Sequence, residues 1–428
     1  MTSARLRARS QRQGLLSFSL LLLGAGAVAL SASSTSAAYT SSSYAHTDDL
    51  TAEIPAPLSV GLSPGQSLDT GSGVGNDGNA YVWGRTDMSL AGGAAWGGTW
   101  KGPTRVGGLP EGEVAAVSGQ IYGFNALQLT GEVWGWGNNP ERDGTGAGRL
   151  DQRPERLRVG SNWNGNGTRL TDIALIASTE QAGAGIRSDG SVWAWGDPSY
   201  GGFFGNGAKQ VPGLPDPLAN DGEQFPVYIT GGYQNFWVIL NSGEVWYWGG
   251  ASSTPGADKA SNSGARVSTA LAPWFRAAVG PGDGYITRIA GGKNLGLAVL
   301  SDGRVLTWGG SGRIGNRPTP PAASEPGLVN DTVLRDIVDA TSAHTGALLR
   351  DSSGNLFSYG AADDVGSNPR TPTLLDTEVI DLAAGQGHYI WRKANGEYWG
   401  KGFNAQGALG TPLGSGLRKL TLDLGVLD

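Results

Sequence analysis

Few residues of this chain have side chains that perform covalent catalysis or hold metal ions. Cysteine is absent, which removes thiolate chemistry, and histidine occurs only at His46, His344 and His388. Zinc sites are built from about four nitrogen, sulfur or carboxylate ligands held close together. Three widely spaced histidines without cysteine do not supply such a set, so the sequence predicts neither a metal centre nor a cofactor.

Acidic residues offer the remaining catalytic chemistry. Asp363–Asp364, and Asp376 with Asp381, are pairs of the kind that glycoside hydrolases use. Neither pair lies in a recognisable motif, and acidic loops are common on a soluble surface. The sequence therefore favours a protein without catalytic residues, with a hydrolase as an alternative.

The segment 162–167, NWNGNG, resembles the start of a calcium-binding loop. The alternating carboxylates of such a loop are missing, and Ile173 occupies the position of its bidentate glutamate. The segment therefore gives calcium binding little support.

A short phrase bounded by two glycines six positions apart occurs seven times along the chain. Its clearest copies read LTGEVWGWG, RSDGSVWAWG and LNSGEVWYWG. The first and last copies start 318 residues apart, so the mean repeat length is 53 residues. The seven copies are Gly78–Gly84, Gly131–Gly137, Gly190–Gly196, Gly243–Gly249, Gly303–Gly309, Gly354–Gly360 and Gly396–Gly402.

Each phrase predicts one strand of a hairpin. Its first glycine suits a two-residue turn, and alternate residues of the following strand face the same side. Upstream lie two more strands with a glycine-containing turn between them, and downstream a polar loop often leads into a fourth strand, such as Pro372–Leu375. Four short strands in a repeat of about 50 residues are typical of a propeller blade. The sequence therefore predicts an all-β fold, a seven-bladed β-propeller with about four short antiparallel strands per blade.

Two alternate positions of the phrase are aromatic in twelve of fourteen cases. Such regularity favours packing between blades over platforms for sugars, because a binding site would vary from copy to copy. The residues are Tyr81/Trp83, Trp134/Trp136, Trp193/Trp195, Trp246/Trp248, Leu306/Trp308, Phe357/Tyr359 and Trp399/Lys401.

The first 38 residues have the order of an export signal. Four arginines precede an apolar run of 16 residues, Leu15–Leu30, and small residues lead to Ala37 and Ala38. The run is shorter than the ~20 residues of a membrane-spanning helix. We expect residues 1–38 to be a cleaved signal peptide, 39–58 a flexible N-terminal segment and 59–428 a single propeller domain. The mature protein is then secreted and extracellular, without membrane association.

The formal net charge of the chain is −6. Loss of the four arginines in the signal peptide would bring it to about −10. Domains that bind nucleic acids carry basic surfaces instead. We therefore expect no nucleic-acid partner.

The last strand-like segment, residues 417–424, has no phrase of its own after it. A propeller must cover the edges of its first and last blades, because open edges promote association. We expect this C-terminal segment to close the ring by pairing with the N-terminal blade around Tyr81–Trp83, and the protein to be a monomer.

The repeat resembles that of the regulator of chromosome condensation family. The fullest match is Asn395–Gly410, NGEYWGKGFNAQGALG, with weaker copies of its ending at Gly202–Gly207 and Gly312–Gly315. The resemblance covers residues 59–428 and implies a seven-bladed propeller, in a secreted bacterial member of the family. Kelch-type and WD-repeat propellers are the alternatives.

The founding members of this family bind chromatin and exchange nucleotide on a small nuclear GTPase. The export signal and the acidic charge argue against that function here. Secreted propellers with this type of repeat inhibit β-lactamase, which implies inhibition of a partner enzyme as one form of binding.

The turns between the first and second strands of the blades are the candidate binding site. Seven-fold geometry places them on one face around the channel, where varied polar and aromatic residues form one patch. Variation in loops also arises from relaxed constraint, and the histidines fit a structural role because this family often has histidine there. The candidate residues are Tyr122, Tyr233, Gln234, Asn235, Lys293, Asn294, His344, His388 and Tyr389.

The sequence therefore predicts a secreted, non-enzymatic protein that binds an extracellular protein partner through this face. Two alternatives have their own marks. A glycan- or cell-wall-binding propeller would expose several aromatic side chains at equivalent positions on one face, and a hydrolase would gather carboxylates at the channel mouth.

Overall fold

The computed structural model describes residues between 61 and 422. All of them belong to one compact unit, Ser36–Asp428. The predicted signal peptide, residues 162–166, Tyr122, Asn294 and Asp363–Asp364 lie outside the described residues. The described residues are 61–62, 69–85, 101–121, 123–137, 153–160, 167–203, 207–217, 220, 222–250, 264–293, 295–309, 325–329, 334–344, 346–360, 371–411 and 416–422.

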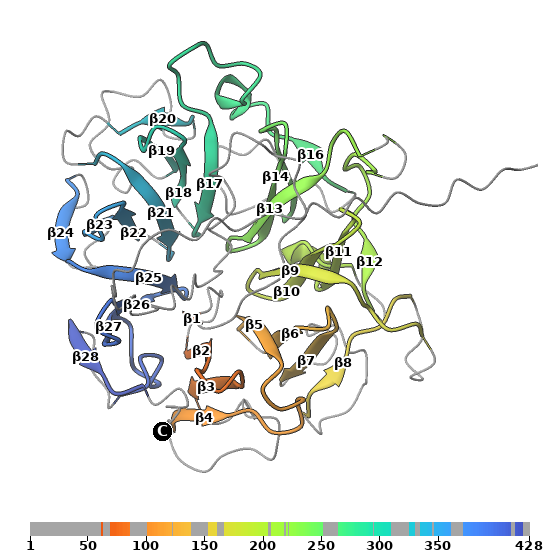
Figure 1. Cartoon of the computed structure of the whole chain (residues 1–428), viewed down its shortest axis with the longest axis vertical. Coiled ribbons are helices and arrows are strands. Elements are labelled where there is room, and N and C mark those ends of the chain that lie inside the picture. The colour runs from red at the N-terminus through yellow and green to blue at the C-terminus, as the bar shows by residue number, and fades with distance from the viewer. Residues whose placement is uncertain are drawn as a thin grey trace, which may run out of the picture. The chain divides into compact units, whose positions relative to one another are not determined.

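Seven four-stranded antiparallel sheets form the blades of a ring (Figure 1). Each sheet consists of four strands that are consecutive in the sequence. In blades two to seven the first strands contact those of neighbouring blades, so the first strand is innermost and the fourth lies at the rim. The predicted all-β, seven-bladed propeller is confirmed.

The strand bounds follow the repeat closely. Two short 3-10 helices, η1 (Pro198–Tyr200) and η2 (Ala272–Trp274), are the helical turns found in the described part of the chain. The blades, in order, are β1 (Gly61–Leu62), β2 (Thr70–Val74), β3 (Ala80–Gly84) and β4 (Lys101–Arg105); β5 (Val114–Gly119), β6 (Gly123–Gln128), β7 (Val133–Gly137) and β8 (Glu155–Arg156); β9 (Ile173–Ser178), β10 (Ala182–Arg187), β11 (Val192–Gly196) and β12 (Lys209–Gln210); β13 (Pro226–Gly231), β14 (Asn235–Leu240), β15 (Val245–Gly249) and β16 (Arg266–Val267); β17 (Ile286–Gly291), β18 (Leu295–Leu300), β19 (Val305–Gly309) and β20 (Gly327–Leu328); β21 (Ile337–Ser342), β22 (Gly346–Asp351), β23 (Leu356–Gly360) and β24 (Thr373–Asp376); and β25 (Val379–Ala384), β26 (His388–Lys393), β27 (Tyr398–Gly402) and β28 (Arg418–Leu420).

The first glycine of each phrase shapes the hairpin between the second and third strands. In the third blade the N–H of Gly190 donates to the carbonyl of Arg187, and the N–H of Arg187 donates to the carbonyl of Ser191, both at 2.8 Å. This is a three-residue loop that ends in a glycine with a φ of 83°, a type I turn followed by a bulge. The same pair of hydrogen bonds recurs in every blade. The predicted two-residue turn is therefore wrong by one residue.

The second of these two phrase positions, a tryptophan in five blades, seals the boundary between two blades. The indole N–H of Trp195 donates to Oδ1 of Asn125 in the preceding blade at 3.1 Å. Trp248 likewise donates to the carbonyl of Gly201 in its preceding blade at 2.8 Å. Five tryptophans occupy this position with at most 2% of their surface exposed: Trp83, Trp136, Trp195, Trp248 and Trp308. Their predicted packing role is confirmed.

Each of these tryptophans lies flat against its neighbouring strand. Gly183 pairs with Trp195, and a Cβ atom on Gly183 would lie 2.2 Å from the indole nitrogen. Phe236 pairs with Trp248 instead, and the two rings stack with centroids 5.1 Å apart. Gly71 and Gly296 repeat the first arrangement, and Phe124 repeats the second.

The seventh and first blades meet through side chains rather than through a shared sheet. In the described residues β28 pairs with β27 of its own blade, and β3 pairs with β4. The predicted pairing of residues 417–424 with Tyr81–Trp83 is therefore wrong. Instead, Trp83 donates to the carbonyl of Ala408 at 2.8 Å and packs with Leu420. Because every blade supplies its own four strands, the tryptophan contact that joins other blades also closes the ring.

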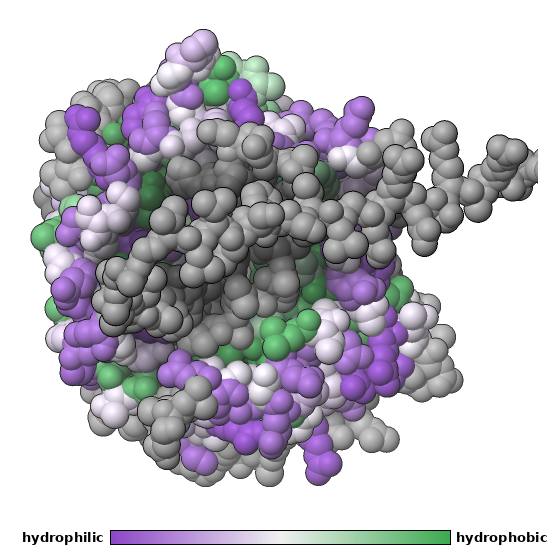
Figure 2. All heavy atoms as spheres, in the orientation of Figure 1, coloured by the Kyte–Doolittle hydropathy of each residue, from purple (hydrophilic) through white to green (hydrophobic). Residues whose placement is uncertain are grey.

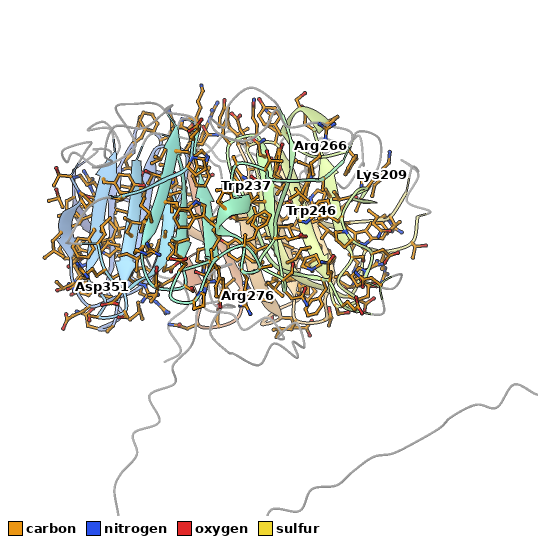
Figure 3. All side chains as sticks on the ribbon, turned by 90° about the horizontal axis from the view of Figure 1, so that it is seen from above. Lys209, Trp237, Trp246, Arg266, Arg276 and Asp351 are labelled. Atoms are coloured by element: carbon orange, nitrogen blue, oxygen red, sulfur yellow. The ribbon has the colours of Figure 1, made fainter. Side chains whose placement is uncertain are left out.

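The strands run between two faces of the ring. Figure 3 places Asp351, the last residue of β22, near the lower face, so the turn that precedes β22 lies near the upper one. We call this upper face, which carries the turns between first and second strands, the turn face. Hydrophilic residues predominate around the rim of the ring (Figure 2). Within the described ranges, no helix has the length and apolarity needed to cross a bilayer.

Gly183→Val should destabilise the propeller. The new side chain would displace Trp195 and break its bond to Asn125, and overpacking of this kind costs about 1–3 kcal/mol. Gly102→Val in β4 is the matched control, because nothing lies within 4 Å of a Cβ at that position. We expect thermal denaturation to show a lower midpoint for Gly183→Val and a nearly unchanged one for Gly102→Val. Equal midpoints would show that the blade boundary tolerates a displaced tryptophan.

Candidate binding site on the turn face

Six turns of equal length join the first and second strands in blades two to seven. Each has three residues, and the flanking strands have six residues in every one of these blades. The middle residue of each turn lies ten positions before the first glycine of the phrase. These middle residues therefore occupy equivalent places around the ring: Ile121, Glu180, Tyr233, Lys293, His344 and Gln386.

Backbone hydrogen bonds tie several of these turns to one another. The N–H of Ile121 donates to the carbonyl of Glu180 at 2.8 Å, and the N–H of Glu180 donates to the carbonyl of Tyr233 at 3.1 Å. The N–H of His344 donates to the carbonyl of Gln386 at 2.7 Å. Each bond joins neighbouring blades, so the side chains of the middle residues are held by a rigid frame.

Tyr233 is the centre of the side-chain contacts. Its ring meets that of His344 edge to face, with centroids 5.0 Å apart and an interplanar angle of 85°. The ammonium nitrogen of Lys293 lies over the Tyr233 ring, 5.1 Å from its centroid. Tyr200 approaches Tyr233 with centroids 6.3 Å apart at 72°. Four blades thus contribute to one contact group of aromatic and cationic side chains.

A local capping motif positions Tyr200. The carboxylate of Asp197 accepts a hydrogen bond from the N–H of Ser199 at 2.8 Å and so starts η1. Gly201 ends η1 with a φ of 91°, a left-handed conformation that glycine adopts readily. The carbonyl of Tyr200 then accepts a hydrogen bond from the hydroxyl of Thr179 at 2.8 Å. The sequence DPSYG therefore holds Tyr200 beside the turn of its own blade.

Glu180 is a buried carboxylate among these residues, with 6% of its surface exposed. It forms hydrogen bonds with the side chains of Gln386, Tyr233 and Tyr200. Glu180 belongs to the third blade and Gln386 to the seventh, so their contact reaches across the ring. Burial raises the pKa of Glu180, although these hydrogen bonds and the charge of Lys293 act in the opposite direction. Its Oε2 atom is buried and has no hydrogen-bond partner among the described residues.

His344 is electrically neutral at physiological pH. Burial, together with the positive charge of Lys293, lowers its pKa from 6.5 to about 4. Its Nε2 atom is buried without a hydrogen-bond partner in the described structure. We call the six side chains that meet here the turn cluster: Glu180, Tyr200, Tyr233, Lys293, His344 and Gln386.

The structure brings together four of the residues that the sequence singled out. Tyr233, Lys293 and His344 belong to the turn cluster, and Gln234 forms a hydrogen bond with the side chain of Tyr200. Tyr122 and Asn294 lie outside the described residues.

Three predicted binding residues are instead buried in the fold. Asn235, His388 and Tyr389 have 1%, 3% and 0% of their surfaces exposed. The side-chain amide of Asn235 donates to the carbonyl of Gly250 at 3.0 Å, and the hydroxyl of Tyr389 accepts from the N–H of Ala343 at 3.3 Å. A surface anchor needs accessible area, so we correct the assignment of these three residues to packing within the ring.

His344 and His388 are not equivalent. His344 is the middle residue of its turn, whereas His388 is the first residue of β26. The turns before β22 and β26 have the same length. The two histidines therefore lie at different offsets, ten and eight positions before the first glycine of their phrases.

Glu180, Tyr200 and Gln386 were missed as site residues. Glu180 and Gln386 lie ten positions before a phrase glycine, as Tyr233, Lys293 and His344 do, so alignment on that offset would have found them. Tyr200 lies after its phrase, and no repeat spacing marks it.

The other candidate carboxylates serve the blade framework. Asp376 accepts hydrogen bonds from Nζ of Lys393 and Nε1 of Trp391, both at 2.8 Å. Burial acts to raise the pKa of Asp376, but these hydrogen bonds outweigh it and the pKa is lowered. Asp381 is buried in β25 with 1% of its surface exposed. No group of three or more His, Asp or Glu side chains suited to a metal ion occurs in the described parts of the chain.

The titration of His344 should reveal its surroundings. The folded state disfavours the charged form of His344. Between pH 6.5 and about 4, His344 therefore binds fewer protons in the folded state than in the unfolded state. His344 should therefore lower the free energy of unfolding as the pH falls through this range. We expect NMR titration to place its pKa near 4, and Lys293→Met to raise that pKa by removing a nearby positive charge. A wild-type His344 pKa near 6.5 would show that the imidazole is solvated and outside the cluster.

Comparisons with known proteins agree with this architecture. No protein-family model matches the chain. Human E3 ubiquitin-protein ligase HERC2 is 24% identical over 271 residues, which cover 61% of this chain and 5% of that protein. The Arabidopsis thaliana RCC1 domain-containing protein RUG3, mitochondrial, is 28% identical over 188 residues, 42% of this chain and 39% of that one. The match thus spans a small part of the first relative and under half of the second.

Solved structures show the same fold. Prp20p from Saccharomyces cerevisiae superposes with a TM-score of 0.63 and 19% identity, covering 85% of this chain and 87% of that one. Human WBSCR16 gives a TM-score of 0.60 and 16% identity, covering 80% and 93%. Together with seven four-stranded blades and a glycine-bounded repeat, these likenesses identify the chain as an RCC1-like seven-bladed β-propeller, the fold of the regulator of chromosome condensation repeat.

Proposed function

We propose that this chain is a secreted, non-enzymatic binding protein whose turn face engages an extracellular protein partner. Inhibition of a partner enzyme is one form that such binding could take. The proposal for export depends on the order of arginines, apolar residues and small residues in the first 38 positions.

The observation that carries the binding proposal is a contrast between two sets of equivalent positions. The blade-sealing position is tryptophan in five blades and serves packing. The middle turn position holds six different residue types in six blades. Packing between blades requires the same residue in most blades, whereas the middle turn position can vary without disturbing that packing. The residues at this position include aromatic, acidic and basic side chains, which are typical of binding surfaces.

The fold is one that mediates protein binding. The solved structure of Prp20p is described together with its binding to Gsp1p and histones. Those partners are stated for Prp20p and do not transfer to this chain, because 19% sequence identity supports a shared fold only. The shared element is the use of a propeller to bind proteins.

The alternative of glycan binding has a specific counter-observation. In two blades the first aromatic of the phrase is partly covered by arginine, with the Arg187 guanidinium 4.7 Å from the Trp193 ring and that of Arg156 4.6 Å from the Trp134 ring. Covered ring faces are poor platforms for sugars. A paired-carboxylate hydrolase is also disfavoured, because the turn cluster contributes one carboxylate, Glu180.

Tyr200→Ala and Tyr233→Ala should each weaken capture of the partner from culture supernatant by about thirtyfold or more, because aromatic anchors carry about 2 kcal/mol or more of binding energy. Leu374→Ala in β24 is the matched control, since Leu374 is 54% exposed but lies on an outermost strand. Capture by tagged protein, followed by affinity measurement for each variant, tests the proposal. Normal binding by both tyrosine variants, with loss in the control, would place the interface on the rim.

Export should leave a defined mature chain. We expect intact-mass analysis of protein from the medium to give an N-terminus at Ala38 or Tyr39, because small residues precede this point. Recovery of the full-length chain from membranes would contradict cleavage and secretion.

A further inference from the structure

We propose that the turn cluster is a recognition site for a cationic side chain, the ammonium of lysine or the guanidinium of arginine, presented by the protein partner. The proposal rests on the binding function above and names the chemistry that the partner must supply. In it, the partner's cation displaces Lys293 from the face of Tyr233 and becomes the ion partner of Glu180.

Tyr233 already holds a cation. The Lys293 ammonium lies over its ring at 5.1 Å, within the range of cation–π attraction. The Lys293 side chain is exposed, and flexible exposed lysines are held weakly because ordering them costs side-chain entropy. The ring is therefore suited to an ammonium or guanidinium group, and its present occupant is readily exchanged.

Glu180 has spare hydrogen-bonding capacity inside the cluster. It is 6% exposed, and its Oε2 atom has no hydrogen-bond partner in the described structure. A buried carboxylate oxygen without a partner costs free energy. A hydrogen-bond donor from a bound molecule would satisfy the Oε2 atom and remove this cost.

The unpaired atoms favour a donor-rich ligand over an anion. Hydrogen bonds from Tyr200, Tyr233 and Gln386 are directed at Glu180, so these donors are engaged. Ammonium offers three donors and guanidinium five, which suits a carboxylate with an open acceptor. His344 adds no competing charge at neutral pH, because burial and Lys293 lower its pKa to about 4.

Long-range charge points the same way. The chain carries a formal net charge of −6. Such a field attracts cationic groups and repels anionic ones during encounter. Within the cluster, exchange of one ammonium for another keeps the charge balance that the folded chain already has.

The test uses three small probes: acetyl-arginine amide, acetyl-lysine amide and the uncharged arginine isostere acetyl-citrulline amide. Binding to the mature wild-type protein is followed by NMR shifts of Tyr233 and His344. We expect shifts that saturate with at least one of the two cations and none with citrulline. Cations that bind no better than citrulline would overturn the proposal.

Two variants give opposite expected signs. Glu180→Gln keeps the shape and should weaken binding of the cation by about tenfold or more, the equivalent of about 1.4 kcal/mol. Lys293→Met removes the resident ammonium and should strengthen binding severalfold. Unchanged affinity in both variants would show that the cation does not bind at the turn cluster. If Glu180→Gln fails to fold, the Lys293→Met variant alone tests the proposal, because Lys293 is exposed. Cation binding to Lys293→Met that is unchanged or weaker than in the wild type would contradict the exchange.

The thermal stability of the Glu180→Gln variant distinguishes a recognition role of Glu180 from a structural role. Because burial raises its pKa, the folded state favours the protonated form, and the charged form is disfavoured as the pH rises through that pKa. We expect Glu180→Gln to melt at or above the wild-type midpoint at pH 7, with the difference shrinking at acidic pH. A large loss of stability at pH 7 would show that Glu180 serves the frame and would contradict its recognition role.

Failure of this proposal is distinguishable from failure of the binding function. Partner capture that depends on Tyr233 while neither cationic probe binds or competes would leave the binding function standing and overturn the cation site. Partner binding that free arginine amide or lysine amide displaces, and citrulline amide does not, would support both.

Discussion

The ring depends on how one indole is held in five of its seven blades. The tryptophan of the third strand lies flat on the second strand of its own blade, over a glycine or against a phenylalanine ring. The N–H groups of Trp83, Trp195 and Trp248 donate to acceptors of the preceding blade. A single side chain thus fixes both the thickness of a blade and its distance from the next.

Ring closure shows the strength of this arrangement. A propeller can close its ring by pairing a strand from one end of the chain with the blade at the other end. The strand-like residues 417–424 predicted such a pairing here. The described strands instead stay within their own blades, and Trp83 makes the seventh-to-first contact with Ala408 and Leu420. The same physical contact therefore joins neighbouring blades whether or not they are neighbours in the sequence.

A rigid frame allows the turn face to carry costly features. Glu180 is buried with an open acceptor, and His344 is kept neutral by burial beside Lys293. Both features disfavour the charged state of a group that would be solvated in a free loop. Backbone bonds between successive turns and the tryptophan contacts beneath them keep these side chains from rearranging to relieve that cost. Perturbed titratable groups held in this way are a mark of functional sites.

The architecture could be predicted from the amino-acid sequence, because periodic signals act locally: two glycines at a fixed spacing set a hairpin, and alternation sets a strand face. It also located Tyr233, Lys293 and His344, which are turn residues at a repeat offset. It misjudged Tyr389 and His388, since a shift of one or two positions moves a side chain from the turn into the packed strand. The folded ring was needed to show that Glu180 of the third blade meets Gln386 of the seventh, and that η1 places Tyr200 beside Tyr233. Contacts across a ring depend on where separate blades converge in space, and no spacing along one chain encodes that convergence.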